Sequence, residues 1–141
     1  MHKLQRITTL YAEDEDRILI AGEGQDLSVQ TLWLSRRLLD RLVPRLSGWL
    51  QSQVGSAQAD VVQSFAQDAA FLALTPEPAV DPAKACESWL VKSIDVTTSP
   101  NDVRLIFNNH AHQAELVMHQ HFLRQWLIIL HGQYQLASWD V

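Results

Sequence analysis

The chain has 141 residues, of which 47% are hydrophobic and 19% carry a charge, and its formal net charge is −5. This length predicts one domain over residues 1–141. The acidic balance disfavours nucleic acid as a partner, because phosphate binding usually needs a basic face. Apolar runs such as residues 126–130 are far shorter than the roughly 20 residues that cross a membrane, so no membrane partner is expected.

The compartment is predicted from the single cysteine and from the first residues of the chain. Cys86 cannot form an internal disulfide and fits a reducing environment. The segment that follows Met1 is polar and then alternates Thr with Ile, unlike the apolar core of a secretion signal. We therefore expect a cytoplasmic protein.

The first half of the chain predicts three strands and a helix. Residues 6–11 are β-branched and aromatic, as strands are, and polar turns then bound two further predicted strands over residues 17–21 and 28–34. Ser35 is expected to cap a helix, because the apolar residues after it recur with the helical period. Those apolar positions are 38, 39, 42, 43, 46, 49 and 50. Pro44 lies inside this helix and is expected to kink it.

The same order of elements returns in the second half. Residues 60–74 predict an extra middle helix, and the three prolines of residues 75–82 predict an extended connector. The later elements are predicted strands over residues 89–97, 103–107 and 114–118, and a predicted helix over residues 120–137.

Matching apolar and charged positions in the two halves suggest an internal repeat. The aligned pairs are Ile7 with Ile94, Arg17 with Arg104 and Leu19 with Ile106 at a separation of 87 residues, and Leu32 with Leu116, Leu42 with Trp126 and Leu46 with Leu130 at a separation of 84 residues. Duplication of a strand–strand–strand–helix unit explains this pattern, although two unrelated amphipathic units of this kind would share part of it.

The sequence thus predicts an α+β fold made from a duplicated βββα unit. The first repeat covers about residues 4–53, the connecting helix and proline-rich linker about 54–87, and the second repeat about 88–139. We expect six mainly antiparallel strands packed with two long helices, plus the extra middle helix. Joining the two units would bury sheet edges that each unit alone would expose.

Four histidines, His110, His112, His119 and His121, invite comparison with a metal site, because imidazole is a common metal ligand. Seven residues of extended chain lead from His112 to His119, so the two pairs lie roughly 20 Å apart at about 3.3 Å per residue. One ion cannot bridge that distance. We therefore predict no metal site and no cofactor, with these histidines in solvent or capping helices.

The starts of the two long helices form a candidate anion site. Ser35, Arg36 and Arg37 begin the first helix, and His119 and His121 occupy the aligned positions of the second. Positive charge in the first turn of a helix opposes the helix dipole, and an anion such as phosphate or carboxylate would relieve this. The alternative is that the arginines pair with Asp40 or with the acidic turn over residues 13–16.

The remaining leads are weaker. The acidic turn over residues 13–16 lacks the ligand spacing of a calcium loop, and the Gly22–Gly24 pair lacks the third glycine of a dinucleotide site. Cys86 has no histidine near it in sequence, so no catalytic residues are predicted. The basic cluster of note is Arg36, Arg37, Arg41 and Arg45.

Trp139 lies near the end of the chain, where residues usually fray unless they are docked. Its indole is expected either to pin the tail onto the fold or to anchor an interface.

The leading functional hypothesis is a non-enzymatic interaction or assembly module that forms a homodimer or binds a protein partner. The alternative is a small-molecule or anion-binding domain, or an enzyme, with its site between the two repeats. Nucleic-acid binding comes third.

Overall fold

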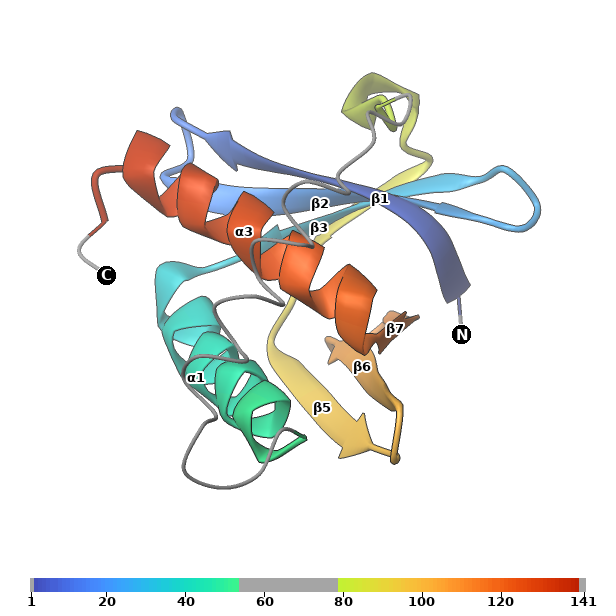
Figure 1. Cartoon of the computed structure of the whole chain (residues 1–141). Helices are drawn as coiled ribbons and strands as arrows, with labels where there is room; N and C mark the ends of the chain where they lie inside the picture. Colours follow the sequence, from blue (N-terminus) through green and yellow to red (C-terminus); the bar gives the residue numbers. More distant parts are fainter. Residues whose placement is uncertain (1, 54–78, 140–141) are drawn as a thin grey trace.

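The computed structural model describes residues 2–53 and 79–139 of the chain (Figure 1). The expected middle helix and most of the expected proline connector lie outside the described residues. In the part that is described, no helix has the length and hydrophobicity needed to cross a membrane.

The protein is α+β, as predicted. The first half contains β1 (His2–Ala12), β2 (Arg17–Gly24), β3 (Val29–Leu34) and α1 (Arg36–Ser52). The second half contains a short 3₁₀ helix η1 (Pro82–Lys84), β4 (Glu87–Leu90), β5 (Ser93–Thr98), β6 (Asp102–Asn108), β7 (Gln113–His119) and α3 (Gln120–Leu136).

The described residues form seven strands, so the expected number of six was wrong. The segment 89–97, predicted as one strand, belongs to two strands that are separated by Val91 and Lys92. The Val91 N–H still donates to the Trp33 carbonyl of β3 (2.9 Å), whereas the Lys92 N–H donates to the Asn108 carbonyl of β6 (2.7 Å). The backbone therefore exchanges one neighbouring strand for another within two residues.

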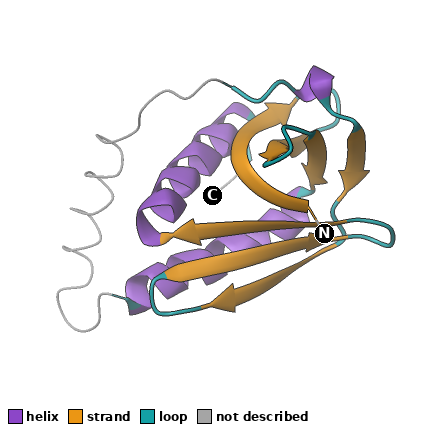
Figure 2. Cartoon of the chain, turned by 90° about the vertical axis from the view of Figure 1, so that its right-hand side faces the viewer, coloured by secondary structure: helices purple, strands orange, loops and turns teal. Residues whose placement is uncertain are grey.

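All seven strands belong to one mixed sheet with the order β4-β3-β2-β1-β7-β6-β5. Two antiparallel meanders, β1–β3 and β5–β7, are joined where His2 and Lys3 pair in parallel with Ala114 and Glu115 of β7. At the other end β4 pairs in parallel with β3 and leads directly into β5. The two edge strands, β4 and β5, are therefore consecutive in the chain, and the sheet curls (Figure 2).

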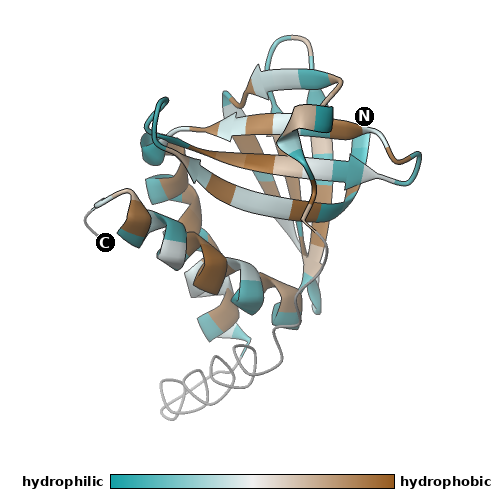
Figure 3. Ribbon diagram, turned by 90° about the horizontal axis from the view of Figure 1, so that it is seen from above, coloured by the Kyte–Doolittle hydropathy of each residue, from teal (hydrophilic) through white to brown (hydrophobic). Residues whose placement is uncertain are grey.

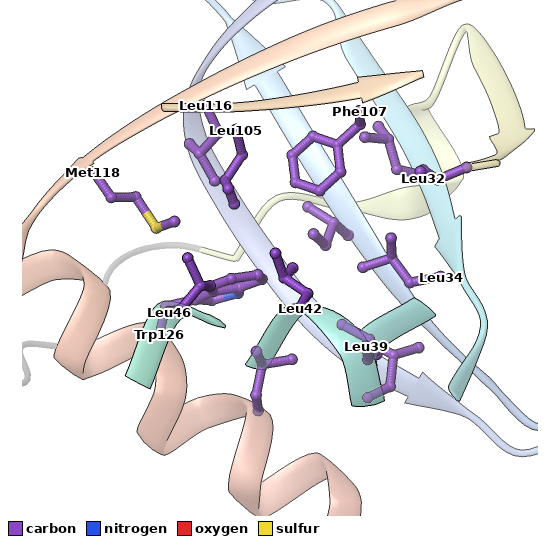
Figure 4. Packing of buried hydrophobic residues seen from close by; sticks show 14 of the residues in the cluster. Leu32, Leu34, Leu39, Leu42, Leu46, Leu105, Phe107, Leu116, Met118 and Trp126 are labelled. Atoms are coloured by element: carbon purple, nitrogen blue, oxygen red, sulfur yellow. The ribbon is translucent and has the colours of Figure 1, made fainter. Parts of the chain in front are cut away.

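The inner face of the curled sheet and the two helices enclose the main core. Hydrophobic residues alternate with hydrophilic ones along the strands (Figure 3), which is the pattern of a sheet with one buried face. The most buried strand residues are Ile18, Ile20, Leu32, Leu34, Leu105, Phe107, Leu116 and Met118. They meet the buried helix residues Leu39, Leu42, Leu46, Leu123, Trp126 and Leu130 (Figure 4). Burial of each such side chain is worth about 1.5–3 kcal/mol.

Both long helices begin as the sequence predicted. The Ser35 hydroxyl accepts a hydrogen bond from the Leu38 N–H (3.3 Å) and caps α1. The helix continues through the exposed Pro44, so this residue does not divide it.

A second, smaller cluster covers the outer face of the first meander. Leu19, Ala21 and Val29 contact Val80, and the Val80 N–H donates to the Thr8 hydroxyl (2.8 Å). The segment that leads into β4 therefore lies across β1–β3 and fixes where β4 can begin.

Three glycines differ in the space available for an added Cβ atom, and this difference gives a test of the core packing. A methyl group at Gly22 would lie 2.7 Å from Cδ2 of the buried Leu4, so Gly22→Ala should destabilise the fold by about 1–2 kcal/mol. Gly48 and Gly132 have open space there and lie inside helices, so Gly48→Ala and Gly132→Ala should stabilise by about 0.5–1 kcal/mol. Urea unfolding of the three variants measures the differences. A stabilising Gly22→Ala would contradict the packing of Leu4 over β2.

Candidate functional site

The carboxylate of Asp16 binds the C-terminal tail to the first hairpin. Asp16 Oδ1 accepts hydrogen bonds from the Tyr11 hydroxyl (2.6 Å) and from Nε1 of Trp139 (3.2 Å). These two bonds hold the pKa of the Asp16 carboxyl below its usual range. The same hydrogen bond with Asp16 raises the pKa of Tyr11 to about 12.

The indole of Trp139 is docked on its own chain. It is only 7% exposed, and it packs edge-on against the rings of Tyr11 and Tyr134 at centroid distances of 5.8 and 5.0 Å. The role of Trp139 in an interface stays a prediction, and the described geometry gives the ring a structural role.

Arg36 also belongs to this C-terminal end of the fold. Its Nε donates to Asp40 (3.3 Å), and its guanidinium carbon lies 5.8 Å from the centre of the Trp139 ring. Asp40 accepts a further hydrogen bond from the Tyr134 hydroxyl of α3 (3.0 Å), and burial followed by this bond raises the pKa of Tyr134. The start of α1 therefore lies beside the end of α3.

The residues of the proposed anion site lie at two distant places. Nδ1 of His119 accepts from the Phe122 N–H (3.3 Å) and caps α3, as Ser35 caps α1, and His121 contacts Gln125 on the exposed side. Because α3 has 17 residues and rises about 1.5 Å per residue, roughly 25 Å separates its start from the Arg36 end. The structure does not bring the two helix starts together into one site.

The other histidine pair lies in the loop before β7, at the opposite end of that strand from His119. The ring of His112 stacks on Trp89 at 5.3 Å, and its Nε2 lies 3.1 Å from the Glu87 carboxylate. Gln30, which is almost fully buried, accepts from Nε1 of Trp89 (3.2 Å) and donates to Glu87 (3.5 Å). This polar network joins β3, β4 and the β6–β7 loop.

The network borders an open cavity of about 510 Å³ that His2 and His110 also line. An imidazole beside a carboxylate can move a proton, but no hydroxyl or thiol of the described residues is hydrogen-bonded to the His112–Glu87 pair. The Cys86 thiol instead donates to the Val29 carbonyl (3.3 Å). In the described ranges, no group of three histidine, cysteine or acidic side chains could hold a metal ion. The bonds of this network connect β3, β4 and the loop before β7, which is a structural role.

The most distinctive surface is a groove between α1 and the β4–β5 junction, which we call the basic groove. One of its two cavities, of about 330 Å³, is lined by Arg17, Arg37, Arg41 and Lys92. The second, of about 230 Å³, is lined by Arg41, Arg45 and Lys92. Both cavities share Leu38, Arg41 and Lys92, so they form one continuous groove.

The basic groove combines charge with an apolar floor. The floor consists of Leu38, Leu42, Leu90, Val91, Ile94 and Val96. None of the five basic side chains of the groove forms an ion pair with any described residue. Like charges that share a concave surface repel one another and attract a bound anion.

Sequence reasoning found part of this groove. Arg37, Arg41 and Arg45 recur every four residues, which is the spacing of one helix face, and all three belong to the basic cluster noted in the sequence. It missed Arg17 and Lys92, which come from β2 and from the β4–β5 junction. Lys92 lies inside the strand predicted over residues 89–97, and a position within a strand does not identify its neighbours in the fold.

Comparison of the chain with protein-family models, curated proteins and solved structures found no match.

The docking of Trp139 should depend on pH in two ranges. Because the pKa of Asp16 is lowered in the fold, its contribution is present above the unfolded pKa of about 3.9 and is lost as the pH falls through the lower folded value. Because the pKa of Tyr11 is raised, its contribution is full below about pH 10 and is lost as the pH rises through about 12.

Fluorescence of the wild type minus that of Trp139→Phe measures this docking, with far-UV circular dichroism to confirm that the fold persists. Asp16→Asn is a suitable control, because asparagine tolerates the positive φ of 50° at this position but cannot ionise. We expect the acid transition of Trp139 to disappear in this variant. An acid transition that persists in Asp16→Asn would show that Asp16 does not hold the tail.

Proposed function

We propose that this protein is a non-enzymatic interaction module that binds an acidic segment of a partner protein in the basic groove. The observation that carries this proposal is the set of five basic side chains without ion-pair partners among the described residues, in a chain whose net charge is −5. Carboxylates of a partner would provide the charge that the groove lacks.

The apolar floor favours a protein segment over a small anion. A phosphate or a carboxylate ligand would bind one or two of the guanidinium groups and leave the floor exposed to water. A peptide can cover Leu38, Leu42 and Ile94 with apolar side chains while its carboxylates reach Arg41 and Lys92. The acidic balance of the chain as a whole would oppose binding of a long polyanion such as nucleic acid.

We also infer that the two halves come from duplication of one βββα unit. Equivalent strand registers support this inference, since Ile18 faces Leu34 in the first meander as Val103 faces Met118 in the second. Likewise, Ile20 faces Leu32 as Leu105 faces Leu116. The helices support it too, because the buried positions Leu39, Leu42, Leu46 and Leu50 of α1 align with Leu123, Trp126, Leu130 and Tyr134 of α3.

This equivalence differs from the sequence alignment in one strand. Leu34 corresponds to Met118, so the residues that face them, Ile18 and Val103, also correspond. The second strands of the two meanders therefore align at a separation of 85 residues instead of 87. The sequence pairs Arg17 with Arg104 and Leu19 with Ile106 are therefore out of register by two residues. An error of two residues preserves the alternation of buried and exposed positions, which is why the sequence alone did not reveal it.

Homodimer formation is a separate part of the interaction hypothesis and stays a prediction. Light scattering on a size-exclusion column, over a wide range of protein concentration, measures it. A mass that rises from that of one chain to that of two with concentration would support assembly. A constant mass of 16.0 kDa would exclude self-assembly in that range and leave the basic groove for other partners.

Charge reversal tests the binding function directly. The probe is a fluorescein-labelled peptide of seven alternating glutamate and valine residues, and its affinity is measured by fluorescence anisotropy. We expect Arg41→Glu and Lys92→Glu each to weaken binding at least tenfold, because a charge-assisted hydrogen bond is worth about 1.5–3 kcal/mol. Lys84→Glu makes the same charge change on the exposed part of η1 outside the groove, and it should change the affinity less than twofold.

The outcomes are distinct. Binding that weakens with added salt and is sensitive to Arg41 and Lys92 but not to Lys84 supports the basic groove as the binding site. Equal loss in all three variants would mean that only the overall charge matters, and it would overturn the proposal. Displacement of the peptide by millimolar inorganic phosphate would favour a small-anion site instead.

A further inference from the structure

We infer that the basic groove binds its partner as an added β-strand along the free edge of β5. This inference rests on the function proposed above and specifies how the partner is held. It makes the backbone of the partner, in addition to its side chains, part of the recognition.

Among the described residues, β5 is the last strand of the sheet, and β6 is the one strand that pairs with it. The Ser99 N–H donates to the Asp102 carbonyl (2.9 Å), which continues the ladder in which Thr97 faces Arg104. Because adjacent residues of an antiparallel pair point their backbone groups in opposite directions, the N–H and C=O groups of Ile94 and Val96 point away from β6. Their free groups lie on the side of the basic groove that these two residues line.

β1 lies between β2 and β7, but in the described part of the chain it pairs with β7 only at His2 and Lys3, so the rest of its β7 side is open to α3. The Tyr11 N–H donates to the side chain of Gln133 in α3 (2.8 Å), and Nε1 of Trp126 donates to the Thr9 hydroxyl (3.0 Å). The α3 helix packs closely against both β1 and β7. The edge of β1 is therefore occupied by the chain itself.

The edge of β5 has no such cover among the described residues. Among the described residues, no backbone or side-chain hydrogen bond joins α1 to β5. The α1 residues that share the groove with β5 are Leu38 and Leu42, which offer no hydrogen bonds, and the exposed Arg41 and Arg45. Figure 1 shows α1 beside β5 with the strand at the margin of the sheet. An open strand edge beside an apolar floor can accept an extended chain.

The basic side chains at this edge favour an acidic segment of a partner protein over a second copy of this chain. If a second copy added its own β5, two sets of Arg41, Arg45 and Lys92 would meet, and like charges in contact oppose such pairing. An extended acidic segment would instead place apolar side chains over Leu42 and carboxylates within reach of the long basic side chains at the rim. β5 has six residues, so a segment of six or seven residues, roughly 20 Å long, matches it.

Backbone methylation separates strand addition from binding through side chains alone. The probe is the alternating glutamate–valine peptide in three forms: unmethylated, N-methylated at the valines, and N-methylated at the glutamates. In an added strand only every second N–H points to β5. We therefore expect one methylated form to lose at least tenfold in affinity and the other to bind within about threefold of the unmethylated peptide.

Amide exchange identifies the edge that the peptide uses. In ¹⁵N-labelled full-length protein, the unmethylated peptide should slow exchange of the Ile94 and Val96 amides at least tenfold. The matched control is the Tyr11 amide, already bonded to Gln133, which should not change. Arg41→Glu should reduce the protection of Ile94 and Val96 at the same peptide concentration, because it weakens binding at least tenfold.

The outcomes distinguish failure of strand addition from failure of the proposed binding function. Binding sensitive to Arg41 but indifferent to both methylations, with no protection of Ile94 and Val96, would overturn strand addition and leave the proposed function intact. Failure of the unmethylated peptide to bind at all would overturn both. Protection of Ile94 and Val96 in the protein alone, rising with concentration as the mass doubles, would show that a second copy occupies the edge, and it would also overturn the proposal.

Discussion

The fold depends on the exchange of strand neighbours at Val91 and Lys92. Up to Val91 the backbone hydrogen-bonds to β3, and from Lys92 onward it hydrogen-bonds to β6. This switch, with the short parallel pairing of β1 and β7, connects the two meanders at both ends. The inner faces of both meanders then surround one core, and both helices bury their apolar faces in it. Two separate open sheets would each leave their edges exposed.

The two ends of the helical layer are held in different ways. Where α1 starts and α3 ends, hydrogen bonds to Asp16 and Asp40 join the first hairpin, both helices and the C-terminal Trp139. At the opposite end of the sheet, the buried Gln30 links Trp89 and Glu87 of β4. Trp139 and Gln30 are buried, and buried polar groups are costly unless they are paired, so their bonds help to fix the positions of the C-terminal tail and of β4.

The difference between the halves is the feature of most functional interest. α3 closes the edge of β1 with polar side chains, whereas α1 presents leucines and arginines to the edge of β5. If the halves arose by duplication, one of them kept a closed edge and the other acquired an open, positively charged one. An open edge is a hazard for aggregation, and under the proposed function the basic side chains around it would oppose pairing between copies and attract an acidic partner.

The sequence by itself determined the local elements, because these depend on the spacing of residues along the chain. Alternating apolar residues identified the strands, the helical period identified the buried faces of α1 and α3, and Ser35 was found as a cap from its neighbours alone. The division of the segment 89–97 was not visible, since it depends on which backbone lies beside each residue. Likewise, only the tertiary structure separated Arg36 from His119 and brought Arg17 and Lys92 to the arginines of α1. Charge and hydrogen-bond partners act through space, and a linear pattern does not record which distant segments become neighbours.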